Sequence, residues 1–217
     1  MILGIVTALV FVLTAAVFVT NRLPATSWLR RAAHAAHRPL GYALVALCVV
    51  HLILVLKLLH QRPLTLFLLG FAMTVCAVFA CCWKVLFPNN PKRGLLLHKI
   101  GGMVMAALLI AHVLVCVNSF VVYQQEMAAV TLTGVSAMDV PDGVYEGSCD
   151  VGYISARVQV TVSDGEMASI DLVEHRNERG TPGEGVVDRM LAAQTTDVDS
   201  VSGATNSSRV IRRAVEN

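Results

Sequence analysis

The sequence predicts a membrane all-α four-helix bundle over residues 1–123 and, after a tether over 124–141, a small α+β domain over 142–217. Of the 217 residues, 55% are hydrophobic and 15% charged, and the mean hydropathy of +0.64 is too high for an ordinary soluble domain. Residues 1–125 contain ten Lys and Arg and no Asp or Glu, whereas residues 126–217 contain seven Arg and all fifteen acids. This separation is typical of a membrane part joined to a water-exposed part. Nucleic-acid binding is not expected, because the positive charge lies between apolar runs.

Four apolar runs support the membrane assignment: 2–20, 39–59, 64–83 and 100–123. Each is close to the ~20 residues that a spanning helix needs. Four buried helices of a soluble bundle are the alternative, but such helices carry a polar stripe, and these runs have none. A signal peptide is the alternative for the first run. We expect that run to be retained, because no positive charge precedes it and it exceeds the usual ~7–15-residue apolar region of a signal peptide.

The basic residues between the runs predict the orientation. The segments 21–38 and 84–99 hold eight Lys and Arg, whereas the connection 57–63 holds two. The positive-inside rule places the two richer segments in the cytoplasm. The N-terminus and the C-terminal domain are therefore expected outside.

Four histidines mark an internal repeat of the membrane part. His37 precedes His51 by fourteen residues, His98 precedes His112 by fourteen, and the two pairs are offset by 61. The same offset moves the first apolar run almost onto the third, which predicts a two-helix hairpin used twice. Because fourteen residues are close to four helical turns, the two histidines of a helix point the same way, about 21 Å apart.

This spacing predicts two haem sites. His37 and His98 should lie at one depth of the bundle and His51 and His112 at another, so that each pair can clamp a haem iron axially. The alternative is that these histidines are buried in the bundle and only form hydrogen bonds with their neighbours. Ionisable residues inside a membrane, however, are energetically costly and usually functional. A zinc or copper site would need ligands within a few ångströms of one another. A covalent c-type haem is excluded, because the chain has no C-x-x-C-H sequence.

The sequence does not assign a single role to the other polar residues near these two levels. His34 and His60 have no partner at the repeat offset, and we interpret both as interfacial. The basic residues near the two levels suit haem propionates or lipid headgroups equally well; they are Arg30, Arg31, Arg38, Arg62 and Lys99.

The membrane part resembles the ferric-reductase-like transmembrane family, whose paired His-x13-His helices carry two b-type haems. The resemblance covers residues 1–123 and rests on the histidine spacing. The chain differs from the eukaryotic oxidases of that family, because it has four helices and no G-x-G-x-x-G sequence after a strand. Direct oxidation of a nicotinamide by this chain is therefore not expected.

The C-terminal part reads as strands followed by helices. Strands are predicted at 143–149, 153–163 and 166–175, with a hairpin turn at Asp164-Gly165, and helices at 184–194 and 205–216. The loop Asp199-Ser200-Val201-Ser202-Gly203-Ala204-Thr205 precedes the last helix and leaves the Thr205 hydroxyl at a helix N-terminus, which favours phosphate. An ordinary Ser/Thr helix cap is the alternative.

Residues 142–217 are similar to the FMN-binding domain of the NqrC and RnfG subunits of sodium-pumping and Rnf complexes. The similarity rests on the stretch D-S-V-S-G-A-T, on D-G-V-Y-E-G from Asp142 and on Thr181-Pro182-Gly183-Glu184-Gly185. It implies that an exported flavin transferase esterifies the phosphate of FMN to Thr205, and that Asp199, Ser202, Gly203 and Ala204 are recognised. It also implies that the glycines of the motif Thr181–Gly185 let the backbone approach the isoalloxazine ring. The stretch before this motif is longer than usual, so the roles of Glu174 and His175 stay open.

Together these features predict a multi-pass protein of a prokaryotic cytoplasmic membrane that carries electrons. The donor would be a quinol, a membrane dehydrogenase or a cytoplasmic donor, and the path two b-type haems followed by covalent FMN. The acceptor would be an extracytoplasmic reductase or a small molecule. The alternative is an accessory redox subunit of a larger ion-pumping or reductase complex. A protein that merely binds haem for regulation or transport is disfavoured by the flavin motif.

Overall fold

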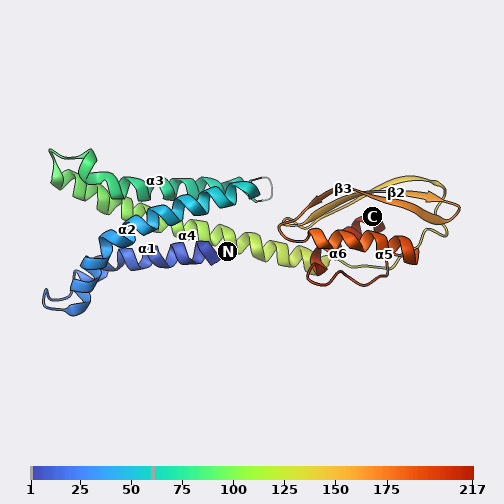
Figure 1. Cartoon of the computed structure of the whole chain (residues 1–217), viewed down its shortest axis with the longest axis horizontal. Helices are drawn as coiled ribbons and strands as arrows, with labels where there is room; N and C mark the ends of the chain where they lie inside the picture. Colours follow the sequence, from blue (N-terminus) through green and yellow to red (C-terminus); the bar gives the residue numbers. More distant parts are fainter. Residues whose placement is uncertain (1, 60–61) are drawn as a thin grey trace. The chain divides into compact units, whose positions relative to one another are not determined.

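A computed structural model describes residues 2–59 and 62–217 of the chain (Figure 1). The chain forms two compact units, Met1–Val117 and Asn118–Asn217. The first is entirely helical and the second contains the sheet. This is the predicted fold class, a helical bundle and a small α+β domain. His60 lies outside the described residues.

The first unit is built from four long helices. They are α1 (Ile2–Thr20), α2 (Trp28–Val55, continued by the short 3-10 helix η1, Leu56–Leu58), α3 (Leu64–Leu86) and α4 (Pro91–Ala129), whose last residues belong to the second unit. Helix α2 packs closely against α1 and α3, whereas the backbone of α4 makes only sparse close approaches to the other helices. The elements that carry the two histidine pairs, α2 and α4, therefore have room for side chains between them.

Two helices are longer than the apolar runs that predict them. Helix α2 begins at Trp28, well before the apolar run, and passes through Pro39. Helix α4 begins with Pro91, a residue suited to the first helical position because its missing N–H has no intrahelical partner there. An apolar run predicts only the part of a helix that can face lipid. The Ala- and Arg-rich stretch before His37 is polar but also favours helix, so it extends α2 toward its N-terminus.

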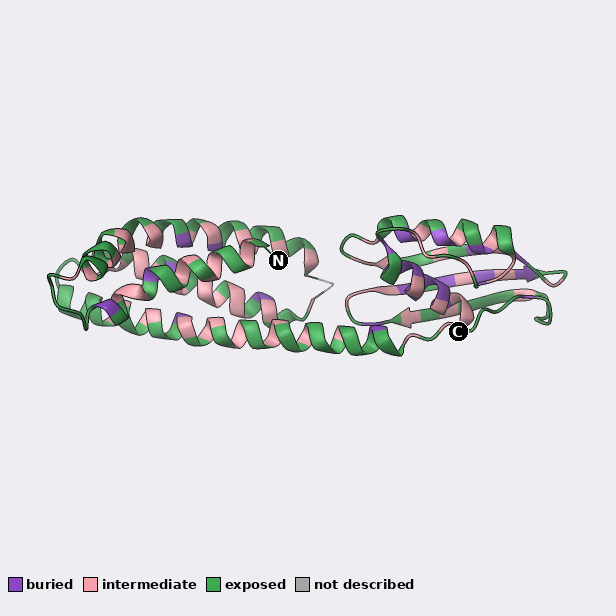
Figure 2. Ribbon diagram, turned by 90° about the horizontal axis from the view of Figure 1, so that it is seen from below, coloured by how far each residue is buried: buried purple, intermediate pink, exposed green. Residues whose placement is uncertain are grey.

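The surfaces of these helices are apolar. Few of their residues are buried, and large side chains such as Leu9, Phe18 and Leu114 are more than half exposed (Figure 2). All four helices are long and apolar enough to cross a membrane. Outward-facing apolar side chains would be unfavourable in water, so the first unit indicates a multi-pass membrane protein.

The second unit contains an antiparallel sheet covered by helices. Its strands β1 (Gly143–Asp150), β2 (Ser155–Ser163) and β3 (Glu166–Arg176) lie in the order β1-β2-β3. Asp164 and Gly165 both have positive φ, as a tight two-residue hairpin requires. The predicted strands and hairpin are thus confirmed. The 3-10 helix η2 (Thr181–Gly185) and the helices α5 (Val186–Ala193) and α6 (Thr205–Glu216) follow.

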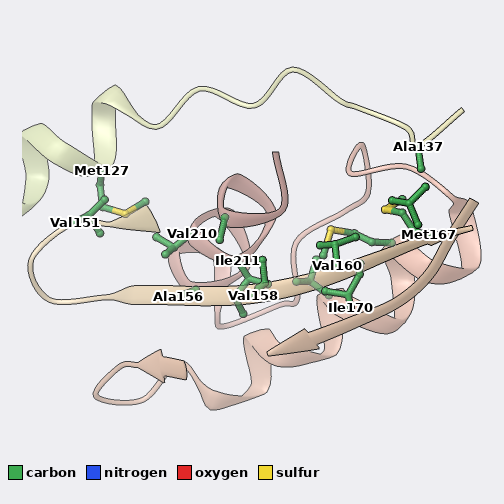
Figure 3. Packing of buried hydrophobic residues seen from close by; sticks show 14 residues of the cluster. Met127, Ala137, Val151, Ala156, Val158, Val160, Met167, Ile170, Val210 and Ile211 are labelled. Atoms are coloured by element: carbon green, nitrogen blue, oxygen red, sulfur yellow. The ribbon is translucent and has the colours of Figure 1, made fainter. Parts of the chain in front are cut away.

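Alternation along β2 builds the core of this unit. Ala156, Val158, Val160 and Val162 are buried at every second position and pack with Ile211 and other apolar residues of α6 (Figure 3). Gly147 of β1 is required at this contact, because a Cβ there would collide with the Ala214 carbonyl of α6. The sheet thereby fixes α6, whose first residue is Thr205.

The segment 124–141, expected to be a tether, packs onto the second unit. Met127 and Ala137 are buried in its core (Figure 3). Arg209 donates a hydrogen bond to the Val130 carbonyl at 2.7 Å. The end of α4 and the α+β domain therefore fold as one body.

A carboxylate at the end of α6 also holds this segment. The Glu216 side chain is inaccessible to solvent and accepts hydrogen bonds from the backbone N–H groups of Thr133 and Gly134 and from the Thr196 hydroxyl at 2.7 Å. Burial raises the pKa of Glu216, but the hydrogen bonds from Thr196, Thr133, Gly134 and Arg213 outweigh burial, and the net shift is downward.

We therefore expect Glu216→Gln to destabilise the second unit at neutral pH, by about 1–3 kcal/mol because hydrogen bonds to a charged group are lost. A lowered folded-state pKa gives stability that is present above the unfolded-state value and lost as pH falls through the folded-state value. Unfolding followed by circular dichroism should show the wild type approaching the variant in acid. An equal difference at neutral and acidic pH would contradict this role of the charge.

Candidate functional site

The loop before α6 presents the proposed acceptor threonine. Gly203 has a φ of +77°, which a residue with a side chain rarely adopts, and the chain then enters α6 through Ala204. Thr205 is the first residue of α6 and is exposed. The helix has no side-chain cap, so Thr205 does not serve as an ordinary capping residue.

Neighbouring side chains hold the backbone of this loop. Ser208 Oγ accepts a hydrogen bond from the Val201 N–H at 3.0 Å and donates to the Ala204 carbonyl at 3.1 Å. Arg189 of α5 donates to the carbonyls of Asp199 and Ser200, at 2.9 and 3.3 Å. An open depression lies beside the loop, lined by Arg189, Asp197, Val198, Asp199, Ser200 and Arg212.

Three side chains of the loop are left available. Within the described residues, the Asp199 carboxylate and the hydroxyls of Ser202 and Thr205 make no hydrogen bond or ion pair, and all three residues are exposed. Arg189 and Ser208 hold the backbone of the loop, and these three side chains face solvent. This arrangement suits a loop that another protein recognises and modifies.

The motif Thr181–Gly185, which forms η2, lies against the first turn of α6. Gly183 is buried in η2, and a Cβ there would come within 2.8 Å of Ser207 Cβ and 3.2 Å of the Ala204 carbonyl. A Cβ on Gly180 would come still closer to Ser207 and would collide with its Oγ, whereas Gly185 has only Val201 nearby. The structure thus gives Gly183 a packing role and brings Thr181 and Pro182, the first residues of η2, to the same end of α6 as Thr205. Contact of this motif with an isoalloxazine ring stays a prediction.

His175 at the end of β3 fastens this motif. Its side chain is 2% exposed, and its Nδ1 lies 2.8 Å from the Glu184 carboxylate within η2. Asn177 accepts a hydrogen bond from the Gly180 N–H at 2.7 Å. These contacts assign His175 and Asn177 to holding η2. Glu174 lies beside Arg157 on the sheet instead, at 3.8 Å.

Two buried polar atoms near this junction have no partner. Ser207 Oγ and His175 Nε2 are buried and make no hydrogen bond within the described residues. Buried polar atoms are nearly always hydrogen-bonded, and Arg176 Nε, next to His175 in the chain, is a third exception. Ser207 is closely packed against Gly180 and Gly183, so its surroundings leave no room for a bulky group. The N-terminus of α6, where the exposed Thr205 lies, is the part of this junction that suits a phosphate-bearing ligand.

Residues 152–217 match the family of the FMN-binding domain. The motif Thr181–Gly185 and the stretch D-S-V-S-G-A-T lie within this range, whereas D-G-V-Y-E-G (142–147) precedes it. An uncharacterized protein of Treponema pallidum (strain Nichols) is 38% identical over 84 residues, which cover 37% of this chain and 23% of the relative. The chain thus spans less than a quarter of the length of that relative. No solved structure matches the chain.

An aromatic pair adjoins the first turn of α6. Tyr123, near the end of α4, stacks on Tyr153 of the β1–β2 turn with ring centroids 5.1 Å apart. Asn206, the residue after Thr205, donates a hydrogen bond to the Tyr123 hydroxyl at 2.7 Å. The end of α4 therefore lies beside the start of α6, where the predicted acceptor Thr205 lies. Sequence reasoning missed this contact, because it joins positions 83 residues apart.

The first histidine pair comes together in the helical unit. The rings of His37 on α2 and His98 on α4 have centroids 5.8 Å apart, with planes at 85°. His37 Nδ1 lies 2.8 Å from the Thr14 carbonyl, and His98 Nδ1 lies 2.9 Å from the Ala80 carbonyl. A carbonyl only accepts, so Nδ1 is the donor in both rings, and in a neutral imidazole this leaves the lone pair on Nε2. This is the arrangement that metal-ligating histidines show.

The second pair is also near-neighbouring. His51 and His112 interact electrostatically, and His51 packs against Gly4 of α1, where a Cβ would come within 3.3 Å of the imidazole. His112 Nδ1 is buried without a hydrogen-bond partner in the described part of the chain. The structure brings the rings of His37 and His98 together, and the pairing of His51 with His112 stays a prediction.

The surroundings of the first pair also leave space. Gly102 follows His98 by four residues, hence lies on the same helical face, and a Cβ there would meet nothing within 4 Å. Two imidazoles with free Nε2 atoms and open space one turn away suit a b-type haem. No group of three or more His, Cys, Asp or Glu side chains that could hold a metal ion occurs in residues 2–59 and 62–217.

His34 and Arg30 lie at the edge of the helical unit. His34 is exposed, and its Nε2 lies 2.7 Å from the Asn21 Oδ1 at the α1–α2 corner. Arg30 donates to the Leu23 carbonyl of the same corner at 3.0 Å. These contacts agree with the interfacial interpretation of His34.

Proposed function

We propose that the protein carries electrons through a membrane, from a quinol or cytoplasmic donor, by way of two b-type haems, to covalently bound FMN and an extracytoplasmic acceptor. The observation that carries the proposal is the combination, in one chain, of an FMN-binding domain and the facing rings of His37 and His98 in apolar helices. A flavin exchanges electrons singly or in pairs and can therefore link one-electron carriers to a two-electron acceptor.

The roles of the residues follow from the contacts described above. His37 and His98 would hold one haem, and His51 and His112 the other, through Nε2. Arg38 and Lys99 directly follow the first pair and are exposed, which suits partners for haem propionates. The carbonyls of Thr14 and Ala80 fix the rings of the first pair.

In the FMN-binding domain, we propose that the exposed Thr205 hydroxyl is the attachment point. A phosphoester there would place the phosphate at the N-terminus of α6, where backbone N–H groups point outward. An exported flavin transferase would read Asp199, Ser202, Gly203 and Ala204. Covalent attachment outside the cell prevents loss of the cofactor by dissociation.

A second candidate function is an accessory redox subunit of a larger ion-pumping or reductase complex. Ion pumping within a membrane usually needs intramembrane carboxylates. Residues 1–125 contain none, so pumping by this chain alone is disfavoured. Purification from the native membrane distinguishes the two functions, because the accessory subunit would stay bound to its complex.

Cofactor content tests the proposal. Protein purified in detergent should contain two haems and one FMN per chain, measured by haem extraction and by flavin absorption after proteolysis. One FMN without haem would contradict the electron path through the helices and leave a membrane-anchored flavoprotein.

The orientation is tested separately. Eight of the ten basic residues of the first 125 lie in the two segments that we place in the cytoplasm. Alkaline phosphatase fused after Asn217 should therefore be active, and a reporter that works only in the cytoplasm should be inactive at the same position. The opposite pattern would place the C-terminal domain in the cytoplasm and would contradict electron transfer to an extracytoplasmic acceptor.

A further inference from the structure

Two stacked tyrosines lie beside the first turn of α6. The rings of Tyr123, near the end of α4, and Tyr153, between β1 and β2, have centroids 5.1 Å apart and planes 19° apart. The Asn206 side chain donates a hydrogen bond to the Tyr123 hydroxyl at 2.7 Å, and Asn206 directly follows Thr205 in the chain. All four residues belong to the second unit. The tyrosine pair is therefore next to the proposed attachment residue.

The turn that carries Tyr153 is held by hydrogen bonds. The Gly152 N–H donates to the Asp150 carboxylate at 2.8 Å. Arg176 of β3 donates to the same carboxylate at 2.9 Å and to the Gly152 carbonyl at 3.1 Å. Gly152 has a φ of +82°, which a residue with a side chain rarely adopts. These contacts fix the backbone beside Tyr153 and thereby limit where its ring can lie.

Tyr123 is held as well, but its ring is not fully covered. It packs against the hydrophobic core of the second unit, as does Met127 one turn further along α4. Phe120, one turn earlier, lies with its ring centroid 6.4 Å from that of Tyr123 and is 51% exposed. Tyr123 and Tyr153 are both only partly buried. The pair thus presents ordered aromatic surface to a further ring.

An FMN attached through its phosphate to Thr205 needs a place for its isoalloxazine ring. This ring is flat and aromatic, and a flexible ribityl chain joins it to the phosphate. Flat aromatic groups bind well to other aromatic rings in offset stacks, which also remove apolar surface from water. The tyrosine pair provides this kind of surface beside the residue after Thr205.

The other surfaces near Thr205 suit the ring less well. The depression beside the D-S-V-S-G-A-T loop is lined by charged and polar residues and by Val198, so it has no flat apolar wall. Gly180 and Gly183 are closely packed against Ser207, so no ring fits between η2 and α6 at that point. The comparison favours the tyrosine pair.

We propose that the isoalloxazine ring of the attached FMN stacks on the Tyr123–Tyr153 pair. The inference rests on the proposed attachment at Thr205 and adds the place where the ring lies. Asn206 is then a positioning residue, because it acts through the Tyr123 hydroxyl. Tyr153 lies within the range that matches the FMN-binding family, whereas Tyr123 precedes it. The end of α4 therefore completes the flavin site of this chain.

Stacking on tyrosine has a spectroscopic consequence. A tyrosine in contact with an excited flavin gives it an electron, and the electron returns to the tyrosine without emission of light. The fluorescence of the flavin is therefore quenched. Stacking also restrains the ring, so the remaining emission stays polarised. Phenylalanine can stack in the same way, but its ring is too difficult to oxidise to quench the flavin.

Fluorescence of the full-length protein in detergent tests the proposal. Tyr153→Leu should raise the emission per covalently bound FMN several-fold and lower its anisotropy. The double variant Tyr123→Phe/Tyr153→Phe should raise the emission similarly and keep the anisotropy of wild type, because both rings remain. FMN and haem contents should equal those of wild type in each variant, and circular dichroism verifies folding.

Tyr145→Leu is the matched control. Tyr145 lies near the start of β1, and its hydroxyl donates to the Pro141 carbonyl at 2.8 Å. Its emission and anisotropy should equal those of wild type. An equal change in Tyr145→Leu, or no change in Tyr153→Leu and the double variant while each holds one FMN per chain, would overturn the stacking and leave the attachment at Thr205 intact. Wild type without covalent FMN would instead contradict the proposed attachment, and the stacking with it.

Discussion

Denatured Thr205→Val protein is expected to show no flavin fluorescence on a gel, whereas denatured wild type fluoresces. Thr205 carries the exposed hydroxyl at the acceptor position, and Ser202, Ser207 and Ser208 lie at other offsets. Ser208 is already engaged with Val201 and Ala204. The Val variant removes the hydroxyl and keeps the branched shape, so the domain should stay folded. Loss of the fluorescent band, from one FMN per chain to none, is the largest effect expected of a single substitution.

Thr161→Val is the matched control. Thr161 lies in β2, where valine is favoured, and its hydroxyl makes no hydrogen bond in the described parts of the chain. This variant should fluoresce like wild type. Fluorescence retained in Thr205→Val would place the linkage elsewhere, and full electron transfer by that variant would show that the flavin is not the exit carrier.

The second large effect is expected of His51→Ala, which should lower the haem content from two to about one per chain. The variant removes one of two axial ligands at the second level, and alanine offers no replacement. The first pair is about 21 Å away along the helix, so its haem should remain. FMN content should not change. Haem extraction and the flavin absorption of the same sample measure both quantities.

His34→Ala is the control for His51→Ala. His34 also lies on α2, but it is exposed and contacts Asn21 at the edge of the unit. Its haem content should stay at two per chain. An unchanged haem content in His51→Ala would show that His51 is not a haem ligand.

The strands and helices of the second unit follow from local patterns. Alternating valines predict β2, and Asp164-Gly165 predicts the turn, because both depend on residues that are near one another in the chain. The four spans follow equally from apolar length. The start of α2 at Trp28 does not, because a charged stretch can be helical without being apolar.

The site was less accessible to sequence reasoning. The D-S-V-S-G-A-T stretch identifies Thr205 as a candidate, but the contacts that shape its surroundings join distant positions. Arg189, Tyr123 and His175 reach the junction only through the fold. The glycines of Thr181–Gly185 predict a close approach of the backbone to the isoalloxazine ring, and the structure gives Gly183 a close contact with Ser207 that the sequence does not reveal. A glycine in sequence indicates a close approach without identifying what approaches.

The same limit applies to the histidine pairs. A fourteen-residue spacing predicts which rings share a depth, but it assigns identical roles to both levels. The carbonyls that contact the first pair belong to Thr14 of α1 and Ala80 of α3, whereas His51 of the second pair packs against Gly4 of α1. A difference between the two levels is therefore a property of the packed bundle, and no period in the sequence encodes it.

Rapid mixing of the oxidised protein with a quinol, followed at haem and flavin wavelengths, tests the central claim most directly. Both haems should be reduced first and the flavin afterwards in wild type. In Thr205→Val, the haems should be reduced at the same rate, and an external acceptor should not reoxidise them. Flavin reduction that precedes haem reduction, or that persists in His51→Ala at the wild-type rate, would contradict an electron path from the helices to the FMN-binding domain.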